Sequence, residues 1–308
     1  MTHQDLFHEG ERAVQVRAGE VHTALLNARM ISPSIMQGAI PFIARQPWVI
    51  LGGEDAAHRL WCSALIGEGG FAQAEPDGSG VTLDLDRAPA HPANPLLATH
   101  LEGRPTGALF IEPATRRRLR VNGRIATAGL RRLRLTVEES FPNCSRFIQK
   151  RSFDGIQSTA VPLSAPRSGT SLGPDELALI AAADTLFLAT RHPDRGVDVS
   201  HRGGRPGFAQ WLDDRTLRLP DYPGNGLFQS FGNLAVDSRM GILVPDFDSG
   251  ALLHLTGFGQ VLWDVPGTEA ETGGTSRFLV FQVAGWVLTP PAEGAPRWSF
   301  VEASPTNP

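Results

Sequence analysis

Short apolar runs alternate with turn residues along the second half of the chain, and this pattern is typical of β-strands. TLFLAT (185–190) and VDVSH (197–201) flank a turn that contains Pro, Asp and Gly. Five further runs follow: FAQWL (208–212), TLRL (216–219), MGILVPDF (240–247), ALLHLTGFGQVLW (251–263) and RFLVFQVAGWVL (277–288). Alternating or β-branched runs between turn signals predict a barrel or a sandwich.

Three other segments carry apolar residues at helical spacing. In Asn225–Val236 the apolar side chains recur every three or four residues, which places them on one face of a helix. Pro174–Ala183 begins with proline, a residue favoured in the first turn of a helix. Gly10–Met30 also repeats its apolar positions every three or four residues. We therefore expect helices over these three ranges.

Two parts of the chain resemble each other. Ser63 and Gly67 match Ser200 and Gly204 at one constant offset, and the Gly-Phe-Ala-Gln of 70–73 recurs at 207–210. At a nearly equal offset, a second set of four residues matches four later ones: Gly107, Leu109, Leu119 and Gly123 match Gly241, Leu243, Leu253 and Gly257. Matches in the same order over this length predict a duplicated domain.

The repeat divides the chain into four parts. We expect an N-terminal helical segment over 1–44, a first domain over 45–160, a linker over 161–174 and a second domain over 175–308. The linker assignment rests on the Pro, Ser and Gly residues of VPLSAPRSGTSLGP. The predicted fold class is mainly β with α (α+β).

Composition excludes several classes of protein. The net charge of −4 gives no general attraction to nucleic acid, and no apolar run approaches the roughly 18 residues of a membrane span. Two cysteines among 308 residues exclude a disulfide framework, and nine scattered histidines without an H-E-x-x-H motif predict no metal site. The N-terminus lacks the apolar core of a secretory signal, so we expect a cytoplasmic protein.

Three stretches resemble one protein family. They are GERAVQ (10–15), FPNCSRFIQKR (141–151), and a run from VDVSHRGG (197–204) through PDYPGN (220–225) to LFQSFGNL (227–234). Together with the order of elements, they resemble the pyridoxamine 5'-phosphate oxidase superfamily of FMN-binding split β-barrels, in a tandem two-barrel subgroup. The resemblance implies a dimer of barrels with flavin in the cleft between them. In this chain it implies an internal pseudo-dimer, and a homodimer of such chains remains open.

The chain also departs from that family. Pro223-Gly224-Asn225-Gly226 stands where the vitamin B6 oxidases have a Ser-Arg-Lys run, and the Arg-Leu-Ala-Pro ending of those enzymes is absent. The resemblance therefore implies a flavin cofactor without implying oxidation of vitamin B6.

The residues of the third stretch suit a flavin phosphate. In a strand, Ser200 and Arg202 share a face, where the guanidinium binds phosphate bidentately and the hydroxyl donates a hydrogen bond, while His201 points oppositely. Tyr222, the only tyrosine, is placed to contact the flavin ring. The candidate cofactor-binding residues are Ser200, His201, Arg202, Gly203, Asp221, Tyr222, Gly224 and Asn225, followed by Asn143, Cys144 and Arg146.

The first copy serves as an internal control. It has Ser63, Ala64 and Leu65 where the second copy has Ser200, His201 and Arg202. We therefore expect one site, formed mainly by the second copy with the first as its wall. An acid-free basic stretch in the first copy could attract a phosphorylated substrate or nucleic acid, and we interpret it instead as a solvated hairpin. Its residues are Arg116, Arg117, Arg118, Arg120, Arg124, Arg131, Arg132 and Arg134.

Each candidate also has a purely structural interpretation. Ser200–Arg202 suits a solvated edge strand, 221–225 suits a turn with a helix cap, and Cys144 suits a buried small residue. The leading functional hypothesis is an FMN-dependent oxidoreductase of unknown substrate, reduced by a nicotinamide or a protein electron donor. The alternatives are a non-catalytic flavin- or haem-binding protein used for storage or sensing, and a scaffold that acts through protein contacts.

Overall fold

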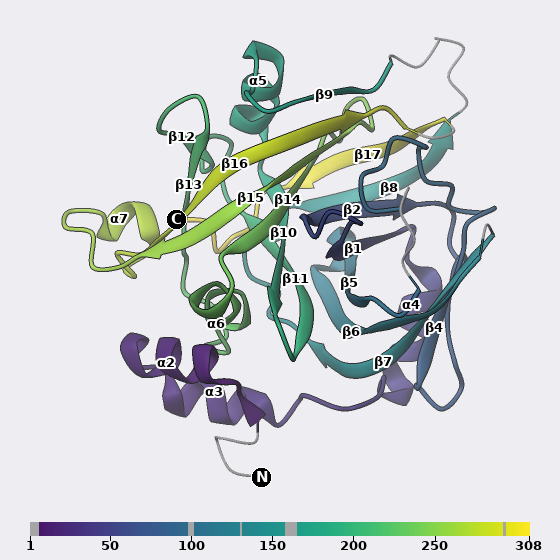
Figure 1. Ribbon diagram of the computed structural model, residues 1–308, viewed down its shortest axis with the longest axis horizontal. Coiled ribbons are helices and arrows are strands. Elements are labelled where there is room, and N and C mark those ends of the chain that lie inside the picture. The colour runs from purple at the N-terminus through teal and green to yellow at the C-terminus, as the bar shows by residue number, and fades with distance from the viewer. Residues whose placement is uncertain (1–5, 98–101, 130, 158–164, 292–293) are drawn as a thin grey trace.

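Two large antiparallel β-sheets dominate the computed structural model, which describes residues 6–97, 102–129, 131–157, 165–291 and 294–308 (Figure 1). The strands of the first sheet are β1 (Trp48–Glu54), β2 (Leu60–Ile66), β3 (Ala72–Ala74), β4 (Gly80–Asp84), β5 (Pro105–Glu112), β6 (Arg117–Ala128) and β7 (Arg132–Pro142). Those of the second are β10 (Thr185–His192), β11 (Gly196–Gly203), β12 (Gln210–Trp211), β13 (Thr216–Pro220), β14 (Arg239–Pro245), β15 (Leu252–Leu262) and β16 (Phe278–Thr289).

The two sheets share one topology. The first has the strand order β2-β1-β5-β6-β7-β4-β3, and the second has β11-β10-β14-β15-β16-β13-β12. Each strand of the first sheet therefore has a counterpart in the second, in the order that the sequence repeat predicts, and the second sheet has one additional strand, β9 (Arg167–Gly169), which pairs with β16. The predicted fold class, two tandem split β-barrels with an N-terminal helical lead-in, is confirmed.

Two glycines matched by the repeat lie at equivalent β-bulges, where the register between two strands shifts. The register between β6 and β7 shifts at Gly123, and the register between β15 and β16 shifts at Gly257. A Cβ atom at Gly123 would lie 1.8 Å from the Thr136 carbonyl oxygen, and one at Gly257 would lie 1.9 Å from that of Gln282. Only glycine fits at these two bulges, because each brings two backbones too close for a side chain.

The barrels pack against each other through the strands β1, β2 and β5 of the first and β10, β11 and β14 of the second. Each barrel has its own apolar interior, and a third cluster fills the interface, with Trp48, Ile50, Leu60, Cys62, Leu109, Phe187, Val197, Val199 and Leu243 among its members. Burying one such side chain contributes about 1.5–3 kcal/mol. The interface is therefore a hydrophobic core in its own right.

A pair of matched glycines brings the barrels into backbone contact. A Cβ atom at Gly107 in β5 would lie 2.6 Å from the Val197 carbonyl oxygen in β11. A Cβ atom at Gly241 in β14 would lie 2.7 Å from the Cys62 amide nitrogen in β2. Since β5 corresponds to β14 and β11 to β2, the two contacts are equivalent across the interface.

The helices follow the predicted ranges with different ends. The Gly10–Met30 range contains two helices, α2 (Glu9–Ala18) and α3 (Val21–Ala28), because Gly19 ends α2 in the left-handed conformation at φ 72°. The helix expected over Asn225–Val236 begins at Gln229 as α6 (Gln229–Val236). Gly226 and Phe228 have positive φ, so these residues cannot belong to the helix. α5 (Pro174–Ala182) ends one residue before its predicted limit.

The remaining elements are short. They are η1 (Gln37–Ala39), α4 (Ile40–Arg45), η2 (Pro113–Thr115), β8 (Lys150–Gln157), β9 (Arg167–Gly169), α7 (Glu269–Thr272) and β17 (Ala295–Glu302). Within the predicted linker, β9 pairs with β16, while residues 161–164 lie outside the described residues. β8 pairs with β17, so the chain's last strand joins a segment placed in the first domain. Among the described residues, no helix is long and apolar enough to cross a membrane.

The N-terminal lead-in packs on the second barrel, where α2 lies against α6 (Figure 1). Their backbones approach closely, because a Cβ atom at Gly10 would lie 2.1 Å from the Gly232 carbonyl oxygen. Glu11 is buried beside this contact and accepts a hydrogen bond from the His8 backbone amide at 2.9 Å. The lead-in thus covers α6, whose first turn faces the site described below.

The Glu11→Gln variant is expected to be more stable than the wild type at alkaline pH. Burial, followed by the nearby Asp198 carboxylate, raises the pKa of Glu11 from 4.5 to about 8. The folded protein therefore keeps this proton where the unfolded chain has lost it, so its contribution to stability falls as pH rises from about 4.5 to 8.

Glutamine keeps the helix-capping acceptor and carries no charge. Thermal melts at pH 5 and pH 8.5 should show little difference between variant and wild type at pH 5, and a midpoint several degrees higher for the variant at pH 8.5. Equal midpoints at pH 8.5 would contradict this account.

Candidate functional site

A pocket lies between the two barrels and is called here the interbarrel pocket. The first-barrel side supplies Leu109, Arg118, Arg120, Asn143, Cys144, Arg146 and Phe147. The second-barrel side supplies Ser200, His201, Arg202, Gly203, Phe208, Pro220, Asp221, Tyr222, Gly224, Asn225, Gly226, Phe228, Gln229, Ser230, Phe231 and Arg277, and Glu20 joins from the N-terminal lead-in.

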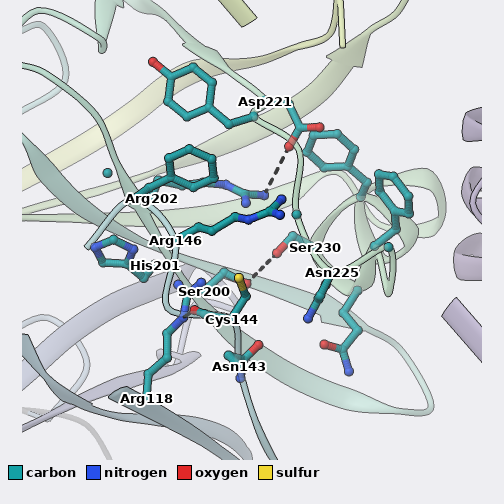
Figure 2. A pocket seen from close by; sticks show the side chains of 18 of the residues that line it. Arg118, Asn143, Cys144, Arg146, Ser200, His201, Arg202, Asp221, Asn225 and Ser230 are labelled. Carbon is teal, nitrogen blue, oxygen red and sulfur yellow. Dashed lines mark hydrogen bonds and ion pairs between the residues drawn. The ribbon is translucent and has the colours of Figure 1, made fainter. Parts of the chain in front are cut away.

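All eleven residues proposed from the sequence line this pocket. Figure 2 labels all of them except Gly203, Tyr222 and Gly224. Ser200–Gly203 come from the end of β11, while Asp221 and Tyr222 follow β13 and Gly224 and Asn225 precede α6. Asn143, Cys144 and Arg146 come from the segment after β7, which crosses from the first barrel. The structure thus brings the candidates together, and their binding of a cofactor remains a prediction.

The pocket is strongly basic. Five guanidinium groups line it, those of Arg118, Arg120, Arg146, Arg202 and Arg277, against two carboxylates, those of Asp221 and Glu20. Such an excess of guanidinium groups attracts an anion, and guanidinium geometry matches phosphate and carboxylate oxygens.

Asp221 lies between two of these guanidinium groups. Its Oδ2 accepts a hydrogen bond from Arg277 Nε at 3.0 Å, and its Oδ1 lies 3.9 Å from Arg202 Nη2. Burial raises the pKa of Asp221 and lowers the pKa of Arg202, because both charges are removed from water. Arg202 therefore gains from a further anionic partner in the pocket.

Hydroxyl groups and α6 form a second polar wall. Ser200 Oγ lies 2.8 Å from Ser230 Oγ and accepts a hydrogen bond from Arg120 Nη2 at 2.7 Å. Arg120 crosses from the first barrel and also pairs with Asp198 at 3.3 Å. Ser200 is thus engaged within the protein. Either hydroxyl can be the donor between them, and when Ser200 donates, Ser230, in the first turn of α6, is able to donate onward. The free N–H groups of that turn also favour an anion.

Several polar groups of the pocket have no partner. His201 is 5% exposed and packs against Phe187, and neither of its ring nitrogens has a hydrogen-bond partner among the described residues. The Asn143 amide nitrogen is likewise buried without a partner in that part of the chain. Burial, followed by the charges of Arg118, Arg202 and Arg151, lowers the pKa of His201 well below its usual value. His201 is therefore a neutral imidazole at pH 7.

Tyr222 lies at the rim of the pocket. Its ring packs on Phe147 of the first-barrel side with ring centroids 4.9 Å apart. Burial raises the pKa of its hydroxyl. Tyr222 and Phe147 therefore form an aromatic pair that spans the two barrels at the site.

Sequence reasoning missed Arg118, Arg120, Ser230 and Arg277. The interpretation of the basic stretch as a solvated hairpin was wrong for Arg118 and Arg120, which alternate with buried Leu119 and Val121 along β6 and line the pocket. That alternation is visible in the sequence, although the barrel on which this face packs is not. Cys144 is half-buried and lines the pocket, so its interpretation as a buried small residue was also wrong.

The equivalent region of the other barrel has a different chemistry. A second cavity is lined by Ala64, Ile66, Leu252 and Thr289, with Leu252 at the position that corresponds to Arg118. His254, which corresponds to Arg120, is held by the Cys62 carbonyl oxygen at 3.0 Å and by Thr289 Oγ1 at 3.2 Å. The arginine side chains Arg118 and Arg120, part of the cationic wall of the interbarrel pocket, therefore have no arginine counterparts at the second cavity.

One group of metal-type ligands, His8, Glu9 and His192, occurs in the described part of the chain. The Nδ1 atoms of both histidines accept backbone N–H groups, from Gly10 at 3.2 Å and from Asp194 at 3.1 Å. These bonds place the ring proton on Nε2, the atom that faces the other ligands. The tautomer therefore disfavours a metal ion here.

No family model and no curated protein matches this chain. Among solved structures, HupZ of Group A Streptococcus is similar at TM-score 0.32 and 11% identity, covering 38% of this chain and 98% of its own. An FAD-binding protein from Mesorhizobium loti is similar at TM-score 0.30 and 13% identity, over 41% of this chain and 99% of that protein. A third similar structure is a Clostridium acetobutylicum protein of the pyridoxinephosphate oxidase family, related to general stress protein 26 of Bacillus subtilis. Its TM-score is 0.26 and its identity 12%, over 38% of this chain and 81% of that protein.

Proposed function

We propose that this chain binds FMN in the interbarrel pocket and acts as a flavin-dependent oxidoreductase. The observation that carries the proposal is the convergence of five guanidinium groups and the first turn of α6 on one pocket between two split barrels. An anion with a planar apolar body fits this combination of cationic wall and aromatic rim. The resemblance of the sequence to FMN-binding split barrels points to the same ligand.

The chain's own residues would bind and orient the cofactor. Arg202 and Ser230, with the N–H groups that open α6, would hold the phosphate. Neutral His201 would offer one donor and one acceptor nitrogen to ring or substrate atoms, and Tyr222 would close the rim. A bound flavin supplies hydride and electron transfer, so the protein needs no strong general base. A nicotinamide or a protein partner would supply the electrons.

A titration of the protein with FMN and with riboflavin tests this proposal. Riboflavin has the same ring and lacks the phosphate, so the ratio of the two affinities reports the cationic wall alone. Charge-assisted hydrogen bonds contribute about 1.5–3 kcal/mol each, so FMN should bind roughly 100-fold more tightly. The difference should shrink in high salt. Equal affinities, or no quenching of flavin fluorescence, would contradict the proposal.

One observation favours a second candidate, non-catalytic binding of haem. The unpartnered imidazole of His201 is a suitable iron ligand, and the guanidinium groups suit propionates. Addition of haem would then give a Soret band that shifts in His201→Gln. A flavin spectrum that is retained after desalting, with no Soret shift, favours the oxidoreductase instead.

A further inference from the structure

The first-barrel side of the interbarrel pocket contains a cation without a matching anion. Arg118, on β6, donates its Nε hydrogen bond to the Cys144 carbonyl oxygen at 2.6 Å. Its two terminal nitrogens have no hydrogen-bond or ion-pair partner among the described residues. Burial lowers the pKa of Arg118 to about 9; Cys144 acts in the opposite direction, and nearby Arg120 and Arg202 lower the pKa further. The charged form of Arg118 therefore gains from an anion that the protein does not supply.

The other guanidinium groups of the pocket have partners. Arg120 pairs with Asp198 at 3.3 Å, Arg277 binds Asp221 at 3.0 Å, and Arg146 donates to the Pro223 carbonyl oxygen at 3.2 Å. Arg202 lies 3.9 Å from Asp221 and, with Ser230 and α6, faces the proposed cofactor phosphate. Arg146 is exposed to solvent, so Arg118 is the less exposed guanidinium of the pocket that still has no anionic partner when that phosphate is bound.

Two further unpartnered groups line the same pocket. They are the buried Asn143 Nδ2 and both ring nitrogens of His201, a side chain that is 5% exposed. Figure 2 shows Arg118 and His201 on the side of the pocket away from Asp221. The three side chains come from β6, from the segment after β7 and from β11, so the fold brings unmatched donors from three places to one wall.

We propose that Arg118, Asn143 and His201 form a subsite for the carboxylate or phosphate group of an anionic substrate, separate from the cofactor phosphate. The inference rests on the proposed function, because the flavin occupies the remainder of the pocket. A planar carboxylate takes two hydrogen bonds from the guanidinium and one from the amide or the imidazole. The substrate class is therefore a small organic anion.

The test uses FMN-loaded protein titrated with benzoate, acetate and inorganic phosphate, with neutral benzamide as the control probe. Perturbation of the flavin absorption band is the readout. Saturable binding of one or more anions, and none of benzamide, is expected. A response to benzoate and acetate alone assigns a carboxylate, and a response to phosphate alone assigns a phosphate ester.

Variants connect the anion to Arg118. In Arg118→Ala and Arg118→Gln, anion affinity should fall at least 10-fold, and by a larger factor than the affinity for FMN. Arg117→Ala is the matched control, because this neighbouring arginine is exposed and does not line the pocket. Loss of FMN from both Arg118 variants, with their folding intact by circular dichroism, would make Arg118 a cofactor ligand and overturn the subsite. A response that is unchanged in the variants would also overturn it.

The subsite has a readout that does not need flavin. If the wild type fails to retain FMN, the proposed function fails, and thermal melts of the apoprotein then test the subsite by itself. A rise in melting temperature with benzoate or phosphate that disappears in Arg118→Gln would support the anion subsite. No rise with any of the anions would overturn it.

Discussion

Replacing Arg202 by alanine should remove most of the protein's affinity for FMN, lowering it roughly 10- to 150-fold. Arg202 lies on the face of β11 that also carries Ser200, and Asp221 at 3.9 Å is its only ion-pair partner among the described residues. The phosphate would therefore gain a nearly free guanidinium. Loss of a charge-assisted hydrogen bond costs about 1.5–3 kcal/mol, which sets the expected range.

Fluorescence titration with FMN measures this loss directly. Arg205→Ala is the control, since Arg205 is exposed near the end of the same strand and donates only to the Pro308 carbonyl oxygen among the described residues. Arg202→Lys should keep part of the affinity, because lysine retains the charge without the bidentate geometry. Arg202→Ala protein that binds FMN like the wild type would show that the phosphate lies elsewhere.

Alanine at Gly107 or at Gly241 should destabilise the protein by about 2 kcal/mol or more. The new methyl group would meet backbone atoms of the opposite barrel, at 2.6 Å for Gly107 and at 2.7 Å for Gly241. Backbone atoms cannot turn aside as a flexible side chain can, so the interface itself must open. FMN binding should weaken in both variants, because the pocket is shared by the two barrels.

Urea denaturation measures the free energy of unfolding for these variants. Gly38→Ala is the matched control, since a Cβ atom there would meet nothing within 4 Å. Interface variants as stable as the control would mean that the barrels are not packed as described.

The repeat in the sequence predicted the fold because its matched residues have structural causes. Gly123 and Gly257 hold the bulges of β6 and β15, and Gly107 and Gly241 hold the interface. Such positions tolerate only glycine, so they remain recognisable in both copies. The alternation of short apolar runs predicted the strands for the same reason, since each barrel interior accepts only apolar side chains.

Features that depend on contact between distant segments were harder to predict. Arg118 and Arg120 belong to the site because β6 faces the second barrel, which no local pattern indicates. The helix α6 begins at Gln229 because Gly226 and Phe228 turn the chain at positive φ, where helical spacing alone suggests an earlier start. The pairing of β8 with β17 joins segments more than 130 residues apart.

The candidate residues of the second copy were found because that copy differs from the first. Ser200, His201 and Arg202 stand against Ser63, Ala64 and Leu65, and the structure places a cationic pocket at the former position. Arg118 and Arg120 of the first copy also differ from the second copy, which has Leu252 and His254 at the matching positions. That difference was interpreted as a solvated hairpin, because the sequence does not show that Arg118 and Arg120 face a pocket shared with the second barrel.

The visible absorption spectrum of the purified protein, before and after loading with FMN and desalting, tests the central claim most directly. A flavin band that survives desalting in the wild type and is lost in Arg202→Ala is the predicted result. A wild-type protein that remains colourless after loading would contradict the claim that this pocket is a flavin site.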